Sequence, residues 1–441
     1  MNLADLLATL SRQFSSSSNL AATTRMPEWQ GWVVLGALLV VFGILIWWLY
    51  FSRIRVIPAG LGGAQLSPSA QRILAGLILL SGVSFTTGTR WDELWHRLYG
   101  GFADDFLWPP HLMIYGSLGL NSAFAGLGLA LAARGSGGIR ERFRANPLVG
   151  LLGLVAAYQL ASIPSDLLWH KIIGPDISAW SLPHFLLMTT ASAVLLIGVA
   201  LTLSNDAPRN WRIAGWPGWG DLATLVLIVT STLALLQFGV TEWEWGGSFG
   251  LTLGRAVWVY PLAVVAIGAI ESHLILFGLR RVGAATVAAI VTVGLQYAFI
   301  AFARAALPPG PALASHLLLV LPALVLDAWY ARKLERAGGP SHLIVGACAY
   351  GAAASLEICF LIRDLLPYPR FSAGDIVLDV VGGMLVAVAL AFVARSTASW
   401  LFTSTSLSRG PGTADALSPL SPRERARVRE GSSTRSIQRY S

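Results

Sequence analysis

Two stretches of the sequence carry the same set of aspartate and histidine residues at matched places. The first contains Asp92, His96 and His111, and the second contains Asp166, His170 and His184. Neutral imidazoles and carboxylates are common ligands of zinc, copper and iron, and two histidines with one carboxylate can form a facial triad. These six residues are therefore the candidate metal ligands of the chain.

The two copies match beyond these six residues. Residues 91–117 read WDELWHRLYGGFADDFLWPPHLMIYGS, and residues 165–192 read SDLLWHKIIGPDISAWSLPHFLLMTTAS. The Asp-x-Leu-Trp-His core has identical internal spacing in both, and a Trp, a Pro and a His follow with a slip of one residue. A degenerate third copy at 241–263 keeps a carboxylate and a proline but neither histidine. The pattern predicts an internal duplication of a helical hairpin.

The spacing also indicates which elements hold these side chains. An aspartate and a histidine four residues apart lie on one face of a helix, where both can share a ligand. Proline is well tolerated at the first helical position, so the Pro-His pair is predicted to open the next helix. A short re-entrant or amphipathic segment between the helices would bring both histidines together. In the alternative reading, each aspartate and histidine simply satisfy one another near the membrane interface.

Haem is a less favoured occupant of the same histidines. A cytochrome b helix carries two histidines fourteen residues apart, as His170 and His184 are. Gly174, Pro175 and Pro183 interrupt that stretch, and proline inside a helix removes a hydrogen bond and bends the chain. One continuous helix with haem at both ends is therefore not expected.

At the level of this motif, Asp-x3-His followed by a second His resembles the metal site in the C subunit of the copper membrane monooxygenases. These are the particulate methane and ammonia oxidisers, in which Asp and two His bind copper within the membrane. The resemblance implies a copper site at Asp92, His96 and His111, and again at Asp166, His170 and His184.

Composition decides the class of protein that must hold these residues. Of the 441 residues, 55% are hydrophobic and only 12% charged, whereas soluble proteins have roughly 25% charged residues. A soluble enzyme is therefore excluded, and an all-α, polytopic membrane protein is predicted. Eleven apolar runs are long enough to span, at about 31–51, 73–90, 110–133, 148–165, 183–203, 221–241, 256–279, 283–303, 312–331, 342–362 and 376–396.

Basic residues set the predicted orientation. If the loop after the first span is cytoplasmic, 22 of the 31 Lys and Arg residues fall on that side. The positive-inside rule then predicts an outside N-terminal leader (1–30) and a cytoplasmic C-terminus. Residues 397–441 are rich in Ser, Pro, Gly and Arg and are predicted to be a disordered basic tail that lies near anionic lipid.

The predicted function follows from the transmembrane domain at 31–396 and its repeated motif. We expect an outward-facing His/Asp metal site in the plasma (inner) membrane, with oxidative chemistry on a small apolar substrate. The alternatives are a proton-coupled transporter or channel, and a structural subunit without catalytic activity. The expected partners are membrane lipid and other membrane subunits, and nucleic acid is not expected.

Overall fold

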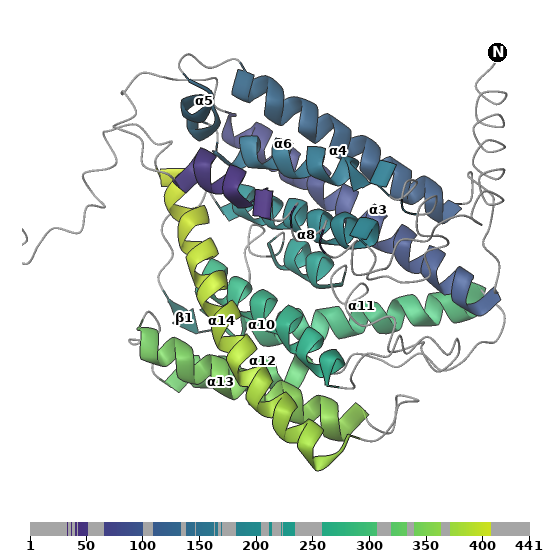
Figure 1. The fold of residues 1–441 in the computed structure, drawn as a ribbon, viewed down its shortest axis with the longest axis vertical. Coiled ribbons are helices and arrows are strands. Elements are labelled where there is room, and N and C mark those ends of the chain that lie inside the picture. Colours follow the sequence, from purple (N-terminus) through teal and green to yellow (C-terminus); the bar gives the residue numbers. More distant parts are fainter. Residues whose placement is uncertain are drawn as a thin grey trace, which may run out of the picture.

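Figure 1 shows the fold as a computed structural model of the chain. The structure describes residues 33, 37, 40–41, 43–51, 66–99, 109–133, 138–145, 147–162, 164–165, 169, 182–203, 211–213, 222, 224–233, 258–306, 319–332, 339–362 and 371–406. The predicted leader, the tail beyond residue 406 and the third motif copy up to residue 257 lie outside these residues.

Within the described residues, the regular elements are helices apart from two very short strands, so the predicted all-α class is confirmed. The α-helices are α3 (Pro68–Tyr99), α4 (Pro109–Ala133), α5 (Ile139–Ala145), α6 (Pro147–Leu160), α8 (Leu182–Leu203), α10 (Val259–Leu279), α11 (Ala284–Ala306), α12 (Val320–Arg332), α13 (Pro340–Glu357) and α14 (Ala373–Ser406). Two π-helical segments are η2 (Trp47–Phe51) and η5 (Ile358–Ile362). The strands are β1 (Arg212–Ile213) and β2 (Arg281–Val282).

Six helices of the described part are long and apolar enough to cross a membrane. Their apolar stretches are Ser69–Asp92, Pro109–Ala130, Leu182–Thr202, Tyr260–Leu279, Pro340–Phe360 and Ala373–Ser399. Shorter apolar helices at Pro147–Leu160, Thr224–Leu233 and Ala284–Ala298 fall on three further predicted runs. The arrangement agrees with a multi-pass membrane protein. Helix α14 continues to Ser406, past the end predicted at residue 396.

Four helices, α3, α4, α6 and α8, pack into a unit that we call the N-terminal bundle (Figure 1). Both α3 and α6 lie against α4 and α8, which closes the four helices into a ring. Gly128 of α4 and Gly153 of α6 meet so closely that a Cβ on either would lie under 3.0 Å from backbone atoms of the other. Such small residues let helix backbones approach in a membrane, where apolar side chains gain nothing by leaving lipid.

Helices α10 to α14 form a second unit, the C-terminal group, in which α10, α13 and α14 contact one another. Helix α12 lies against α13, and α11 lies against α10 and α12. At the contact between α13 and α14, a Cβ on Gly351 would lie 2.4 Å from the backbone oxygen of Gly383. Gly351 is therefore needed for the two helices to pack at this distance.

Helix α14 has one packed face and one open face. The alanines Ala387, Ala391 and Ala394 recur at helical spacing and are fully buried. The opposite face is apolar and exposed, with Val377 at 64% and Leu385 at 68% of their accessible surface. In a membrane protein, this open face is suited to contact with lipid tails.

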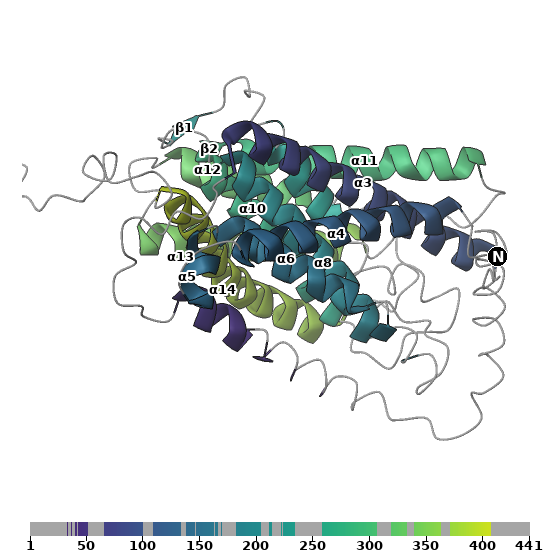
Figure 2. The same ribbon diagram turned by 90° about the horizontal axis from the view of Figure 1, so that it is seen from above.

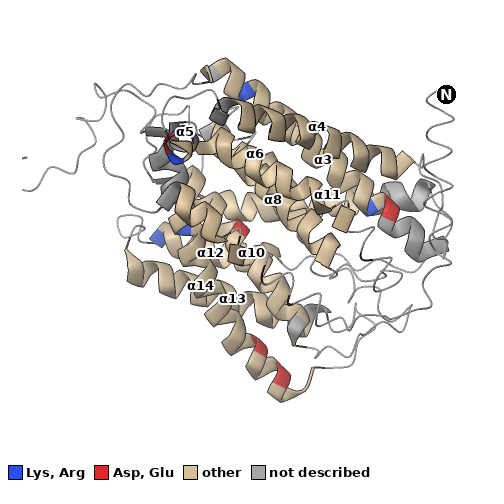
Figure 3. Cartoon of the chain, turned by 45° about the horizontal axis from the view of Figure 1, so that its top comes forward, with Lys and Arg blue, Asp and Glu red and all other residues tan. Residues whose placement is uncertain are grey.

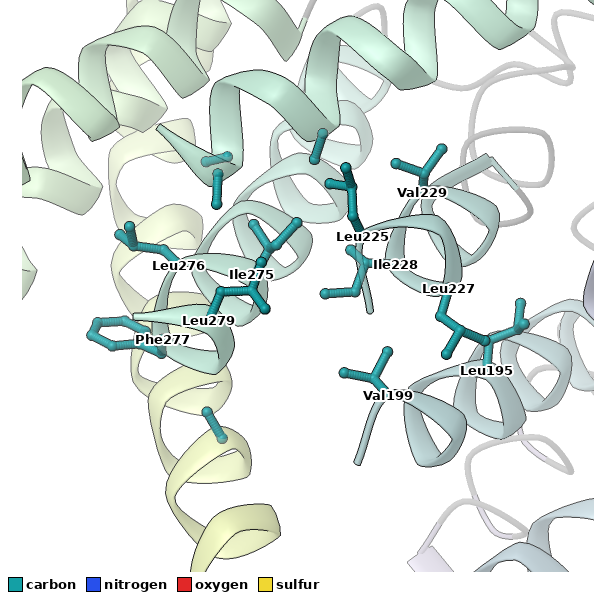
Figure 4. Packing of buried hydrophobic residues seen from close by; sticks show 14 of the residues in the cluster. Leu195, Val199, Leu225, Leu227, Ile228, Val229, Ile275, Leu276, Phe277 and Leu279 are labelled. Carbon is teal, nitrogen blue, oxygen red and sulfur yellow. The ribbon is translucent and has the colours of Figure 1, made fainter. Parts of the chain in front are cut away.

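A short helix at Thr224–Leu233, here called the bridging helix, joins the two units. Figure 4 shows Leu227 pointing toward Leu195 of α8, while Ile228 lies on the side of Ile275 in α10. Leu227 packs close to Gly198 of α8, and the hydroxyls of Thr224 and Thr202 lie 3.0 Å apart. The bridging helix therefore shares a continuous apolar core with both units.

Basic loops gather at one end of the molecule. Strand β1 pairs in parallel with β2, which places Arg212 opposite Arg281. Helix α5 packs against α4 and α6. Figure 3 shows the Lys and Arg segments mainly at the end where α5 lies. Seen from above, most helices run along one common direction between this end and the opposite one (Figure 2). The two basic segments that carry Arg212 and Arg281 thus meet in space.

Candidate functional site

The first copy of the motif spans the end of α3 and the start of α4. Asp92 and His96 both lie on α3, which continues to Tyr99, and α4 begins at Pro109. The predictions that the aspartate and histidine share a helix and that proline opens the next one are confirmed here. The side chain of His96 lies outside the described residues.

Asp92 and His111 meet across the two helices. The Nε2 atom of His111 lies 3.0 Å from Oδ1 of Asp92, and the two side chains retain 18% and 22% of their exposure. Gly88, one turn before Asp92, makes this approach possible, because a Cβ there would lie 2.8 Å from the backbone oxygen of Pro110. The sequence motif thus brings a carboxylate and an imidazole together at a partly open helix end.

This contact supports two kinds of chemistry. A histidine beside a carboxylate can hold a proton between the two groups as an ion pair. Alternatively, two ligands at about 2.1 Å from one metal ion stand about 3.0–3.4 Å apart, which the observed separation matches. The ring of His111 also lies 5.9 Å from that of Tyr115, so an aromatic side chain borders the pair on α4.

Below this pair, polar side chains follow the seam between α3 and α4. The hydroxyl of Ser84 donates to the backbone oxygen of Met113 at 2.9 Å. One turn deeper, the hydroxyls of Ser81 and Ser117 lie 2.8 Å apart. The seam is therefore polar from its open end into the interior of the N-terminal bundle.

The seam ends in an amide pair at the centre of the bundle. Asn121 of α4 donates from Nδ2 to Oε1 of Gln159 of α6 at 2.6 Å. Nε2 of Gln159 donates in turn to the backbone oxygen of Leu187 in α8 at 3.4 Å, and Ser81 donates to Oδ1 of Asn121 at 3.3 Å. All three polar side chains are buried to 98% or more, so this network joins four helices without charge.

The second copy is described only in part. His184 lies half-buried in the first turn of α8, behind Pro183, which is the place that His111 holds in α4. Asp166 and His170 lie outside the described residues. In the part of the chain that the structure describes, no three or more His, Cys, Asp or Glu side chains gather as a metal site would require. Two of the six predicted ligands are thus brought together, and the six-residue site stays a prediction.

Several ionisable residues inside apolar runs have definite structural partners. Asp327 of α12 accepts from Thr286 through both its backbone N–H, at 2.8 Å, and its hydroxyl, at 2.7 Å. Asp379 of α14 accepts at its backbone oxygen from Ser355 at 2.7 Å, and its Oδ2 lies 3.5 Å from Sγ of Cys359. These contacts lie at helix ends and helix crossings, where they hold elements together.

Several polar residues with defined contacts lie outside the Asp/His motif. Asn121 and Gln159 are polar residues inside apolar runs, which marks them as unusual. The sequence pattern does not indicate that they contact each other. His342, at the start of α13, stacks on Trp329 with ring centroids 5.0 Å apart. Tyr330 lies edge-on to the same imidazole at 4.8 Å, so His342 belongs to a packed aromatic cluster at the basic end.

Comparison with known proteins gives no family assignment. No protein-family model matches the chain, and neither the curated proteins nor the solved structures contain a significant match. Function must therefore be argued from the residues and their geometry.

Proposed function

We propose that the chain is a multi-pass membrane protein with an outward-facing site for a transition metal, built from the Asp/His motifs of two duplicated hairpins. The observation that carries the proposal is the contact between Asp92 and His111 at 3.0 Å. These residues lie 19 positions apart in the sequence, were selected by motif alone, and meet at the open end of two helices. Copper, iron and zinc all suit such a ligand set.

The packing of the N-terminal bundle supports the duplication. The hairpin α3–α4 carries the first motif, and the hairpin α6–α8 carries the second. Helix α3 contacts α8 across the hairpins, just as α6 contacts α4. Exchanging one hairpin for the other therefore reproduces the same set of helix contacts, as expected for two related halves. On this basis we assign eleven spans, including the shorter apolar helices.

The six motif residues would share the metal as ligands. Asp92 and Asp166 would provide carboxylate oxygens, and His96, His111, His170 and His184 would provide imidazole nitrogens. A bound metal of this type supplies activation of oxygen or water, for oxidation of a small apolar substrate. The protein positions two of these ligands: the close approach of α3 and α4 at Gly88 holds His111 against Asp92.

The proposal includes an orientation in the plasma membrane. The basic loops that meet at the end holding α5 and the two strands face the cytoplasm under the positive-inside rule. The metal site, at the opposite ends of α3 and α4, then faces outward. Other membrane subunits are the expected protein partners, in addition to lipid.

Elemental mass spectrometry tests the metal site. The protein is purified in mild detergent, reconstituted separately with copper, iron and zinc, and freed of loosely bound metal. We expect about one or two tightly bound metal ions per chain, with nitrogen and oxygen ligands in the X-ray absorption spectrum. His111→Ala should lower the bound metal strongly, and replacing all four motif histidines should abolish it.

A matched control separates ligand loss from misfolding. His342→Gln changes a histidine at the basic end, away from the motif, and should leave the metal content unchanged. Size-exclusion chromatography confirms that each variant is folded. Absence of tightly bound metal in the folded wild-type protein after all three reconstitutions would refute the proposal, as would unaltered binding in the four-histidine variant.

A further inference from the structure

Helix α10 carries a glutamate deep inside its apolar span. Glu271 lies within Tyr260–Leu279, which is the most buried of the six candidate spans, and only 3% of its surface is exposed. An ionised carboxylate is strongly unfavourable in such surroundings unless a positive charge or several donors compensate it. Ionisable residues inside a membrane helix often mark the path of an ion or a proton.

The contacts of Glu271 leave one of its oxygens without a partner. Oε1 accepts a hydrogen bond from Oγ of Ser231 in the bridging helix at 3.0 Å. Oε2 is buried and has no hydrogen-bond partner among the described residues. Ser231 is itself fully buried. A carboxylate would leave uncompensated charge on Oε2, whereas a carboxylic acid places a proton there.

Among the described residues, no charged side chain is bonded to this glutamate. The elements packed against α10 are α11, α13, α14, β2 and the bridging helix. Their described titratable or charged side chains are Arg281, Tyr297, His342, Cys348, Tyr350, Glu357, Asp375, Asp379 and Arg395. None of these is bonded to Glu271 in the described part of the structure. On α10 itself, His273 directs Nδ1 toward the backbone oxygen of Ala269 at 2.7 Å and lies against Tyr350.

Asp327 shows how a buried carboxylate looks when its role is structural. It accepts two hydrogen bonds on Oδ2, both from Thr286 in the first turn of α11, while its Oδ1, like Oε2 of Glu271, has no hydrogen-bond partner among the described residues. The positive end of that helix dipole compensates its negative charge. Glu271 lies mid-helix, away from both ends of α10, and interacts with hydroxyls of the bridging helix, of which Ser231 lies 3.0 Å from Oε1. The two carboxyl groups therefore differ in charge compensation, because only Asp327 lies at a helix N-terminus.

We propose that Glu271 is an exchangeable proton-binding site between the N-terminal bundle and the C-terminal group. Ser231 belongs to the bridging helix, so gain or loss of the proton alters the polar contact that joins this helix to α10. Coupling-ion sites in transporters lie near the membrane midplane between two halves of the protein. The site is separate from the proposed metal centre, and Glu271→Gln should leave metal content unchanged whether or not the metal proposal holds.

Infrared difference spectroscopy on the full-length protein in lipid tests the proposal. The wild type should show a carbonyl-stretch band of a protonated carboxyl group that shifts in D₂O and weakens as pH rises. The band should be absent in Glu271→Gln, which keeps the size of the side chain and its acceptor for Ser231. Asp327→Asn is the matched control and should retain the band.

Labelling with dicyclohexylcarbodiimide provides a second readout. This apolar reagent adds to a protonated carboxyl group and leaves an N-acylurea on the peptide containing residue 271, without loss of any atom. Above the midpoint of titration, labelling should fall about tenfold per pH unit. A pH-insensitive band that does not shift in D₂O would overturn the exchange, and a spectrum unchanged by Glu271→Gln would overturn the assignment. Protection by sodium at constant pH would replace the proton with a metal cation and likewise overturn it.

Discussion

The amide pair at the centre of the N-terminal bundle should be a measurable source of stability. Gln159 joins three helices, because its Oε1 accepts from Asn121 of α4 at 2.6 Å and its Nε2 donates to Leu187 of α8 at 3.4 Å. Gln159→Leu keeps a similar volume and removes both bonds. It also leaves the Asn121 amide N–H without this acceptor, whereas the Leu187 carbonyl keeps the hydroxyl of Thr190 at 3.2 Å.

The magnitude follows from the number of bonds. An interhelical hydrogen bond in a membrane protein contributes about 0.6 kcal/mol on average and about 1.7 kcal/mol at most. Two lost bonds and one unpaired donor therefore predict a loss of about 1–3 kcal/mol in the free energy of unfolding for Gln159→Leu. In a double-mutant cycle with Asn121→Leu, the coupling energy should be about 0.5–1.5 kcal/mol, because both single changes break the same bond.

Unfolding in mixed micelles with increasing sodium dodecyl sulfate measures these free energies. Gln296→Leu is the matched control, because Gln296 lies in apolar helix α11 and its Oε1 has no hydrogen-bond partner among the described residues. The control should be neutral or slightly stabilising. Additive single effects, with a coupling below about 0.3 kcal/mol, would refute the inferred network, as would equal losses for Gln159→Leu and Gln296→Leu.

Three further predictions concern packing, a helix end and orientation. Gly128→Val should destabilise the bundle by about 1–3 kcal/mol because the side chain would meet the backbone of α6, whereas Gly126→Val on the same helix has open space and should be nearly neutral in the same unfolding assay. Asp327→Ala should lower stability by about 1–3 kcal/mol, since two donors of α11 lose their acceptor; a change below the scatter of the wild type would contradict this. In a cysteine-free background, Gly138→Cys should react with a membrane-impermeant maleimide only from the cytoplasm and Ser372→Cys only from outside. Labelling of both from one side would contradict the orientation.

Much of the fold follows from local rules that the sequence makes visible. Continuous apolar runs predicted α3, α4, α8, α10, α13 and α14, because a spanning segment must satisfy its backbone groups internally. The Pro-His pair correctly predicted the start of α4 at Pro109. The matched spacing of the motif selected Asp92 and His111, which the structure places in contact.

The pairing of helices was not predictable in the same way. Helices such as α6, α8 and α10 are apolar on every side, so no periodicity indicates which face is packed. The contacts of Asn121 with Gln159, and of Ser231 with Glu271, depend on which helices become neighbours. Glu271 stands in the sequence as a carboxyl inside an apolar run, but the run does not indicate that Ser231 faces it.

The length of α14 has a consequence for how the protein sits in its bilayer. Its apolar stretch Ala373–Ser399 has 27 residues and is therefore about 40 Å long. The hydrocarbon layer is about 30 Å thick, so this stretch fits if the helix tilts by about 40° from the membrane normal. Figure 1 shows α14 running obliquely across the molecule.

Such a tilt displaces the two ends of α14 sideways by about 25 Å. One helix can then pack along α13 and α10 and still touch α6 and α8 of the other unit. Its exposed face at Val377 and Leu385 would follow the same slope through the lipid. Bilayer thickness would thus affect the packing of this protein, because a thinner or thicker membrane would change the tilt of a helix that contacts both units.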